Sequence, residues 1–139
     1  MKLLLIALSL VSSFAFASEG SLNMHYSGFE GRNRVFLSCD YAEDQTRYVL
    51  EKLGATNIQT NCFGGIQYGN MSPISIRAKY TTNTSRVGEV VDLTDSNGNC
   101  FFETALVEEI LRDFPYTEIL RERGHCFRSN SSYQFQIKL

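Results

Sequence analysis

The amino-acid sequence predicts an α+β fold in which a mainly antiparallel sheet carries two helices on one of its faces. Segments with the alternating polarity of strands flank two segments that have the periodicity of helices. The order of these segments is also the same in two halves of the chain, at about residues 33–80 and 89–139. We therefore expect two β-α-β-β halves. A ferredoxin-like β-α-β-β-α-β arrangement is the near alternative, because it reassigns only one strand.

The first residues have the three parts of a secretory signal peptide. Lys2 gives a positive start, residues 3–11 are apolar, and residues 15–17 place alanines at the −3 and −1 positions of a cleavage site. The apolar stretch is shorter than the roughly twenty residues that a membrane-spanning helix needs. We therefore expect residues 1–17 to be cleaved. Residues 18–139 should then form one compact domain, exported to a periplasm or the extracellular space, with no transmembrane segment.

The first helix is predicted by its cap and its apolar spacing. Asp40 is followed three residues later by Glu43, which is the spacing of a capping box. Apolar residues recur at helical spacing over residues 42–53, and Gly54 provides a stop.

Three strands and a loop complete the predicted first half. Residues 34–38 form an apolar run with β-branched and aromatic members, and residues 56–63 and 74–80 alternate with a period of two. Residues 64–73 begin with two glycines and end with a proline, which predicts a flexible loop.

The second half repeats this order. We expect a linker at 81–89, a strand at 90–94, a turn at 95–99, a helix at 102–114 ended by Pro115, and strands at 116–127 and 133–139. The charged centre of residues 116–127 leaves a second helix there as the alternative.

The four cysteines are expected to form two disulfide bonds, because an exported chain with an even number of cysteines most often cross-links them. Cys39 and Cys62 each close a predicted strand of the first half, and Cys100 and Cys126 lie near strand ends of the second. Parallel strands of one strand-helix-strand unit end at the same edge of a sheet. This favours Cys39–Cys62 and Cys100–Cys126, and the other two connectivities stay open.

The segment around Cys100 has a second interpretation. Residues 95–102, followed by Ala105, resemble the nucleophile segment of OTU-type cysteine proteases, which carry an Asp-Gly-x-Cys stretch at the start of a helix. In such a position the helix dipole and exposed amides lower the pKa of a thiol. The resemblance implies a small cysteine hydrolase with Cys100 as nucleophile and His125 as its base. His125 lies much closer to the cysteine than the histidine of that family does.

A candidate binding surface is the aromatic-rich segment that contains Phe63, Ile66, Tyr68 and Met71. Exposed aromatic residues on a loop are common in recognition, whereas packing back on the sheet is the alternative.

Composition narrows the classes of function. The net charge is −2 and no Lys or Arg cluster is present, so we expect no nucleic-acid partner. The histidines are distant and no Cys-x-x-Cys occurs, so we expect neither a metal nor a cofactor. The sequence therefore predicts an exported, non-catalytic module that binds a protein or a cell-envelope component, with inhibition as one mode of action.

Overall fold

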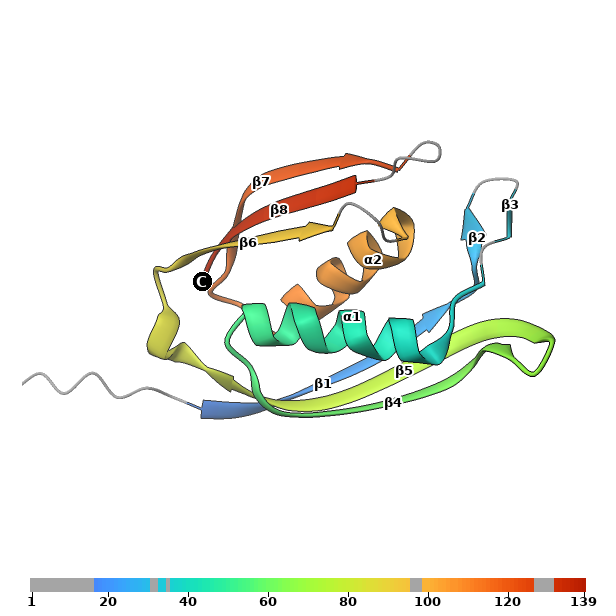
Figure 1. Cartoon of the computed structure of the whole chain (residues 1–139). Coiled ribbons are helices and arrows are strands. Elements are labelled where there is room, and N and C mark those ends of the chain that lie inside the picture. Colours follow the sequence, from blue (N-terminus) through green and yellow to red (C-terminus); the bar gives the residue numbers. More distant parts are fainter. Residues whose placement is uncertain (1–16, 31–32, 35, 96–98, 127–131) are drawn as a thin grey trace, which may run out of the picture.

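The computed structural model describes residues 17–30, 33–34, 36–95, 99–126 and 132–139. Two three-stranded antiparallel sheets enclose two helices (Figure 1). Sheet 1 has the strand order β1-β5-β4 and sheet 2 the order β6-β8-β7. The predicted α+β class is confirmed. The strands are divided between two sheets, and both helices lie in the layer between them.

The elements of the first half are β1 (Ala17–Tyr26), β2 (Phe29–Glu30), β3 (Asn33–Arg34), α1 (Cys39–Lys52), β4 (Thr56–Gln67) and β5 (Asn70–Asn83). A short 3₁₀ helix, η1 (Thr84–Arg86), leads to β6 (Val90–Asp95), α2 (Cys100–Leu111), β7 (Glu118–His125) and β8 (Ser132–Lys138). Apart from the small β2–β3 hairpin, both halves follow a β-α-β-β order. In each sheet the last strand of the half lies between the other two.

The first strand of sheet 1 was not predicted. Residues 34–38 were expected to be a strand, but β3 ends at Arg34, Val35 lies outside the described residues, and Phe36 to Ser38 are irregular. β1 takes the strand position instead. The alternation of apolar and polar residues in β1 is weak because one of its inward positions is Gly20. The ring of Tyr80 fills the space that a side chain at this position would take.

The caps of both helices use neutral side chains. The N-cap of α1 is Ser38, whose hydroxyl accepts a hydrogen bond from the Tyr41 amide at 3.2 Å, and not the expected Asp40. Ser38 can serve as the N-cap because it is the residue immediately before the first residue of α1, where a side-chain hydroxyl can reach a first-turn amide. Asn99 caps α2 in the same way, through the amide of Phe102.

The helices differ in sequence because they differ in surroundings. α1 is amphipathic: it packs on β4 and β5 of sheet 1 and contacts β6 of sheet 2, while Asp40, Asp44 and Glu51 are exposed. α2 contacts β1 of sheet 1 and β8 of sheet 2, and its buried residues include Phe102, Leu106 and Ile110. A helix that is buried around more of its circumference needs apolar residues on more of its faces.

The end of α2 is linked to sheet 1 through Asp113. One carboxylate oxygen of Asp113 accepts hydrogen bonds from the Tyr80 hydroxyl at 2.7 Å and from the Ser21 amide at 3.2 Å. The Tyr80 ring also stacks on Phe114, with 6.0 Å between ring centroids. Burial raises the pKa of the Tyr80 phenol well above its ordinary value, and the hydrogen bond and negative charge of Asp113 raise it further.

We expect Tyr80→Phe to lower the free energy of unfolding by about 1 kcal/mol at pH 7, since one hydrogen bond is lost. Because the folded pKa of Tyr80 lies above the unfolded value of about 10, its contribution is full below pH 10 and is lost as the pH rises further. Urea unfolding between pH 8 and about 12 should show a steeper alkaline loss for the native chain than for the variant. Parallel curves would contradict this assignment.

Candidate functional site

The hairpin formed by β4 and β5 projects beyond the first turn of α1 (Figure 1). Residues 64–73, expected to be a flexible loop, are the end of this hairpin, so that prediction was wrong. The ladder continues to the pair Gln67 and Asn70. Between them Tyr68 and Gly69 both have positive φ angles, 46° and 83°, which is the pattern of a two-residue type I′ turn.

Two glycines shape the base of this hairpin rather than loosen it. Gly64 has φ 85°, and a Cβ there would lie 2.1 Å from the carbonyl oxygen of Pro73. A Cβ on Gly65 would lie 2.3 Å from the carbonyl oxygen of Leu37. Pro73 cannot donate to the ladder and lies at a register shift between β4 and β5. The glycines therefore mark a close approach of three chain segments.

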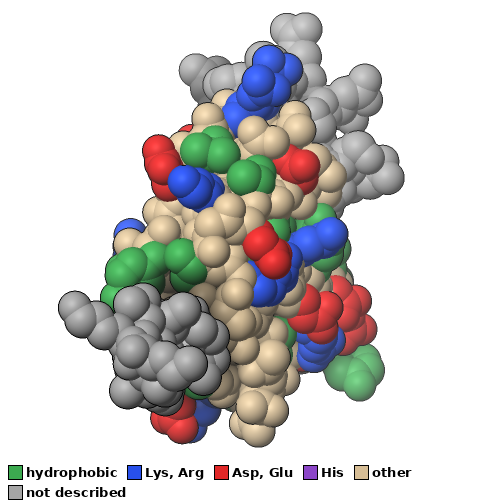
Figure 2. Space-filling model, turned by 90° about the vertical axis from the view of Figure 1, so that its left-hand side faces the viewer, with side chains coloured by type: hydrophobic (Ala, Val, Ile, Leu, Met, Phe, Trp, Pro, Cys, Tyr) green, Lys and Arg blue, Asp and Glu red, His purple; other side chains and the backbone are tan. Residues whose placement is uncertain are grey.

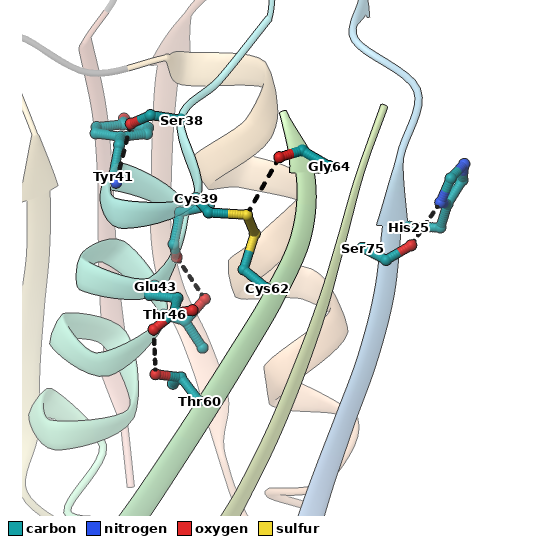
Figure 3. Close-up of a disulfide and its surroundings, with 11 residues drawn as sticks. His25, Ser38, Cys39, Tyr41, Glu43, Thr46, Thr60, Cys62, Gly64 and Ser75 are labelled. Atoms are coloured by element: carbon teal, nitrogen blue, oxygen red, sulfur yellow. Dashed lines mark hydrogen bonds between the residues drawn. A yellow bond between two sulfur atoms is a disulfide. The ribbon is translucent and has the colours of Figure 1, made fainter. Parts of the chain in front are cut away.

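A disulfide bond fixes the hairpin to α1. Cys39, the first residue of α1, is bonded to Cys62 of β4, with 5.4 Å between the Cα atoms (Figure 3). The sulfur of Cys39 lies 3.5 Å from the Gly64 carbonyl oxygen. Two residues beyond Gly64, the Ile66 amide donates to the Leu37 carbonyl at 3.0 Å. The base of the hairpin is thus held by a covalent bond and by backbone contact.

A short polar chain extends this attachment along α1. Arg47 donates to the Thr60 hydroxyl at 3.1 Å, and that hydroxyl donates to the Glu43 carboxylate at 3.0 Å. Glu43, expected in a capping box, therefore joins the helix to β4 instead (Figure 3).

The four side chains predicted as a binding surface are exposed on the hairpin. Phe63 is 53% exposed, Ile66 44% and Met71 62%, and Tyr68 is fully exposed. Ile66 is paired directly with Met71, so their side chains share one face of the hairpin. We call Ile66, Tyr68 and Met71 the hairpin tip. These side chains do not pack back on the sheet, and whether they bind a partner stays a prediction.

Tyr68 occupies an unfavourable position for its type. A left-handed backbone is uncommon for bulky residues, and type I′ turns favour Asn, Asp and Gly. Its side chain is fully exposed, so burial does not offset the strain.

The outward side of sheet 1 holds further polar residues that the sequence analysis did not single out. In one row, His25 of β1 pairs with Ser75 of β5, and the His25 Nδ1 atom lies 3.0 Å from the Ser75 hydroxyl (Figure 3). Serine–histidine pairs occur in hydrolases when a third group orients the base. Within the described residues, no such third group is hydrogen-bonded to His25. This pair is a cross-strand contact.

Cys100 is bonded to Cys126, with 5.3 Å between the Cα atoms. Both predicted disulfide pairings are therefore present in the structure. A bonded sulfur is not a nucleophile, and Cys100 is 2% exposed. Residues 96–98 and the side chain of His125, which the hydrolase interpretation requires, lie outside the described part of the structure.

Next to Cys100, a buried contact joins the starts of the two helices. The Tyr41 hydroxyl donates to the carboxylate of Glu103, which is 1% exposed, and accepts from the Asn99 amide at 2.9 Å. The carboxylate is enclosed between α1 and α2, so this contact stabilises their packing.

Three properties of the described residues concern possible binding of metal ions, membranes and charged partners. No group of three or more His, Cys, Asp or Glu side chains is placed to hold a metal ion among them. None of the helices that they form combines the length and apolarity needed to cross a bilayer. On the side shown in Figure 2, acidic and basic side chains are interspersed and hydrophobic side chains form small groups.

Comparison with known proteins gives no match: no family model, curated protein or solved structure matches the chain. Fold and geometry therefore carry the functional inference.

We expect the double variant Cys39→Ala, Cys62→Ala to lose about 3 to 4 kcal/mol of unfolding free energy in urea, from the entropy of the opened loop. It should also speed amide hydrogen exchange at the base of the hairpin. Cys100→Ala, Cys126→Ala is a matched control, because the two bonds span similar separations of 23 and 26 residues. The control should lose similar stability without selective exchange in the hairpin. Equal hairpin exchange in both variants would contradict the anchoring role.

Proposed function

We propose that the chain is an exported, non-catalytic module that binds a protein or a cell-envelope component through the hairpin tip. The observation that carries this proposal is Tyr68, a fully exposed aromatic residue in a strained left-handed turn. Strain of this kind persists where a function needs it. Asn-Gly would form the same turn more readily.

The chemistry of the tip favours a protein surface as its partner. Aromatic residues and methionine are enriched at protein interfaces, and Tyr68 and Met71 supply both. A narrow hairpin can also enter a cleft, which is the way in which it would act as an inhibitor.

The attachment of the hairpin supports the same proposal. Binding costs less entropy when the binding segment is already ordered. The Cys39–Cys62 bond and the Ile66–Leu37 hydrogen bond order the base before any partner arrives.

Export is supported by the two disulfide bonds, which are typical of oxidising compartments. We propose the signal peptide at residues 1–17 from the sequence alone, since residues 1–16 lie outside the described part of the structure. We also propose that the two halves are internal repeats, which their equivalent strand orders support.

Replacing Tyr68 should separate stability from function. We expect Tyr68→Asn to raise the free energy of unfolding by about 0.5 to 1 kcal/mol, because asparagine tolerates the left-handed backbone. Tyr68→Phe keeps the strain and should leave stability unchanged. Urea unfolding of the three proteins is the measurement. A loss of stability in Tyr68→Asn would show that the tyrosine stabilises the fold, and would remove the argument for a binding role.

Binding can be tested by cross-linking capture from envelope and target-cell extracts. The tip variant is Tyr68→Asn, Met71→Ser. The control is Tyr116→Asn, Val87→Ser, which changes exposed residues beside Thr82 and Asn83, at the end of β5 away from the hairpin tip. A partner captured by the native chain and the control, and lost at least about tenfold by the tip variant, supports the proposal. Equal capture by all three, or no partner in either extract, contradicts it.

A further inference from the structure

The solvent-facing side of sheet 1, which we call the outer face, carries ordered rows of polar side chains. Strand pairing places Asn23, Arg77 and Asn61 in one row. The next row holds Ser21, Lys79 and Gln59. All six residues are exposed. The helices lie on the opposite side of this sheet, so none of the described helices or strands covers the outer face (Figure 1).

The middle strand gives the outer face a positive centre. Arg77 and Lys79 are two residues apart on β5 and therefore point to the same side. Their row neighbours are neutral amides and a hydroxyl, and neither cation forms an ion pair within the described residues. Among the described residues of these three strands, the one acidic side chain on the outer face is Glu19, which lies one row beyond Lys79. The face therefore suits a ligand that carries negative charge.

One end of the outer face is hollowed. A cavity of about 560 Å³ lies there, and it is lined by Glu19, Ser21, Asn57, Gln59, Lys79 and Thr81. The strand pairing shifts by one residue beside Asn57, which has φ 52°. The lining therefore contains an ammonium group, a carboxylate, amides and hydroxyls. Together they place hydrogen-bond donors and acceptors close to one another. Such a lining matches a ligand rich in hydroxyl groups.

The other end of the outer face offers an aromatic ring. Phe63 is in the same row as Ser75 and His25 and is 53% exposed. An exposed ring provides an apolar surface against which the C–H side of a sugar can pack.

The combination of two cations, a polar hollow and an exposed aromatic ring distinguishes between classes of ligand. Two cations are too few to follow a nucleic-acid backbone. A protein partner would need buried apolar anchors, and the central rows have none. We propose that the outer face of sheet 1 binds an acidic oligosaccharide, a chain of sugars that bears carboxylate groups. Arg77 and Lys79 bind the carboxylates, the amides bind hydroxyl groups, and Phe63 packs on a sugar ring.

Sheet 2 supplies a matched control for this surface. Arg121 and Arg123 are also two residues apart on one strand and exposed. The row of Arg121, however, contains Asp92, which accepts a hydrogen bond from Gln136 at 3.2 Å. Arg121→Gln, Arg123→Gln therefore removes the same charge from an edge strand, on a face whose rows also contain the acidic residues Asp92 and Glu118.

Isothermal titration calorimetry at low ionic strength tests the proposal with three probes. They are polygalacturonate oligomers, dextran oligomers of equal length, and polyglutamate. We expect polygalacturonate to bind and the affinity to fall as salt is added. Dextran, which lacks carboxylates, should bind at least about tenfold more weakly. Polyglutamate, which lacks hydroxyl groups, should bind at least about tenfold more weakly as well.

The variants separate this surface from the hairpin tip. Arg77→Gln, Lys79→Gln should weaken polygalacturonate binding at least about tenfold. Arg121→Gln, Arg123→Gln and Tyr68→Asn should leave it unchanged. Three results overturn the proposal: no binding of polygalacturonate, equal binding of polyglutamate, or equal losses in the two arginine-containing double variants. None of these depends on whether the tip captures a protein.

Discussion

The Cys39–Cys62 bond joins the first turn of α1 to β4 at the place where the hairpin leaves the body of the protein. On one side of this bond α1 is held in the layer between two sheets; on the other the strands continue without a helix above them. Without an anchor, a two-stranded ribbon of this kind is marginal in water. The disulfide bond and the Leu37 contact make it an extension of sheet 1.

This constraint links the two proposed binding surfaces. The hairpin tip is built from β4 and β5, and these are also two of the three strands of the outer face of sheet 1. Twist and register along these strands therefore set the position of Tyr68 at one end and of Lys79 towards the other. The Gly64–Gly65 bulge lies between the two surfaces, and Gly64 is two residues beyond the bonded Cys62. Local distortion at the bulge re-aims the tip without disturbing the regular rows below it.

Much of the fold follows from periodicity, because the strongly alternating segments at 56–63, 74–80 and 133–139 each pack one face on a core. β1 could not be predicted from the local sequence. The inward space at Gly20 is filled by the side chain of Tyr80 on β5, and the residues around Gly20 give no sign of this contact. In the sequence the glycines at the hairpin base predict flexibility, whereas in the structure close backbone contact requires them. The exposed tip residues were identified from their types alone. The outer face could not be, because its rows exist only once the register of three strands is known.

The central claim is that all four sulfurs are scaffold, with one bond in each half. Iodoacetamide treatment of the denatured, unreduced mature protein, followed by intact mass and non-reducing peptide mapping, tests this directly. We expect no alkylation, with one linked peptide pair containing Cys39 and Cys62 and another containing Cys100 and Cys126. Alkylation of Cys100, or a linked pair that joins the first half to the second, would contradict it.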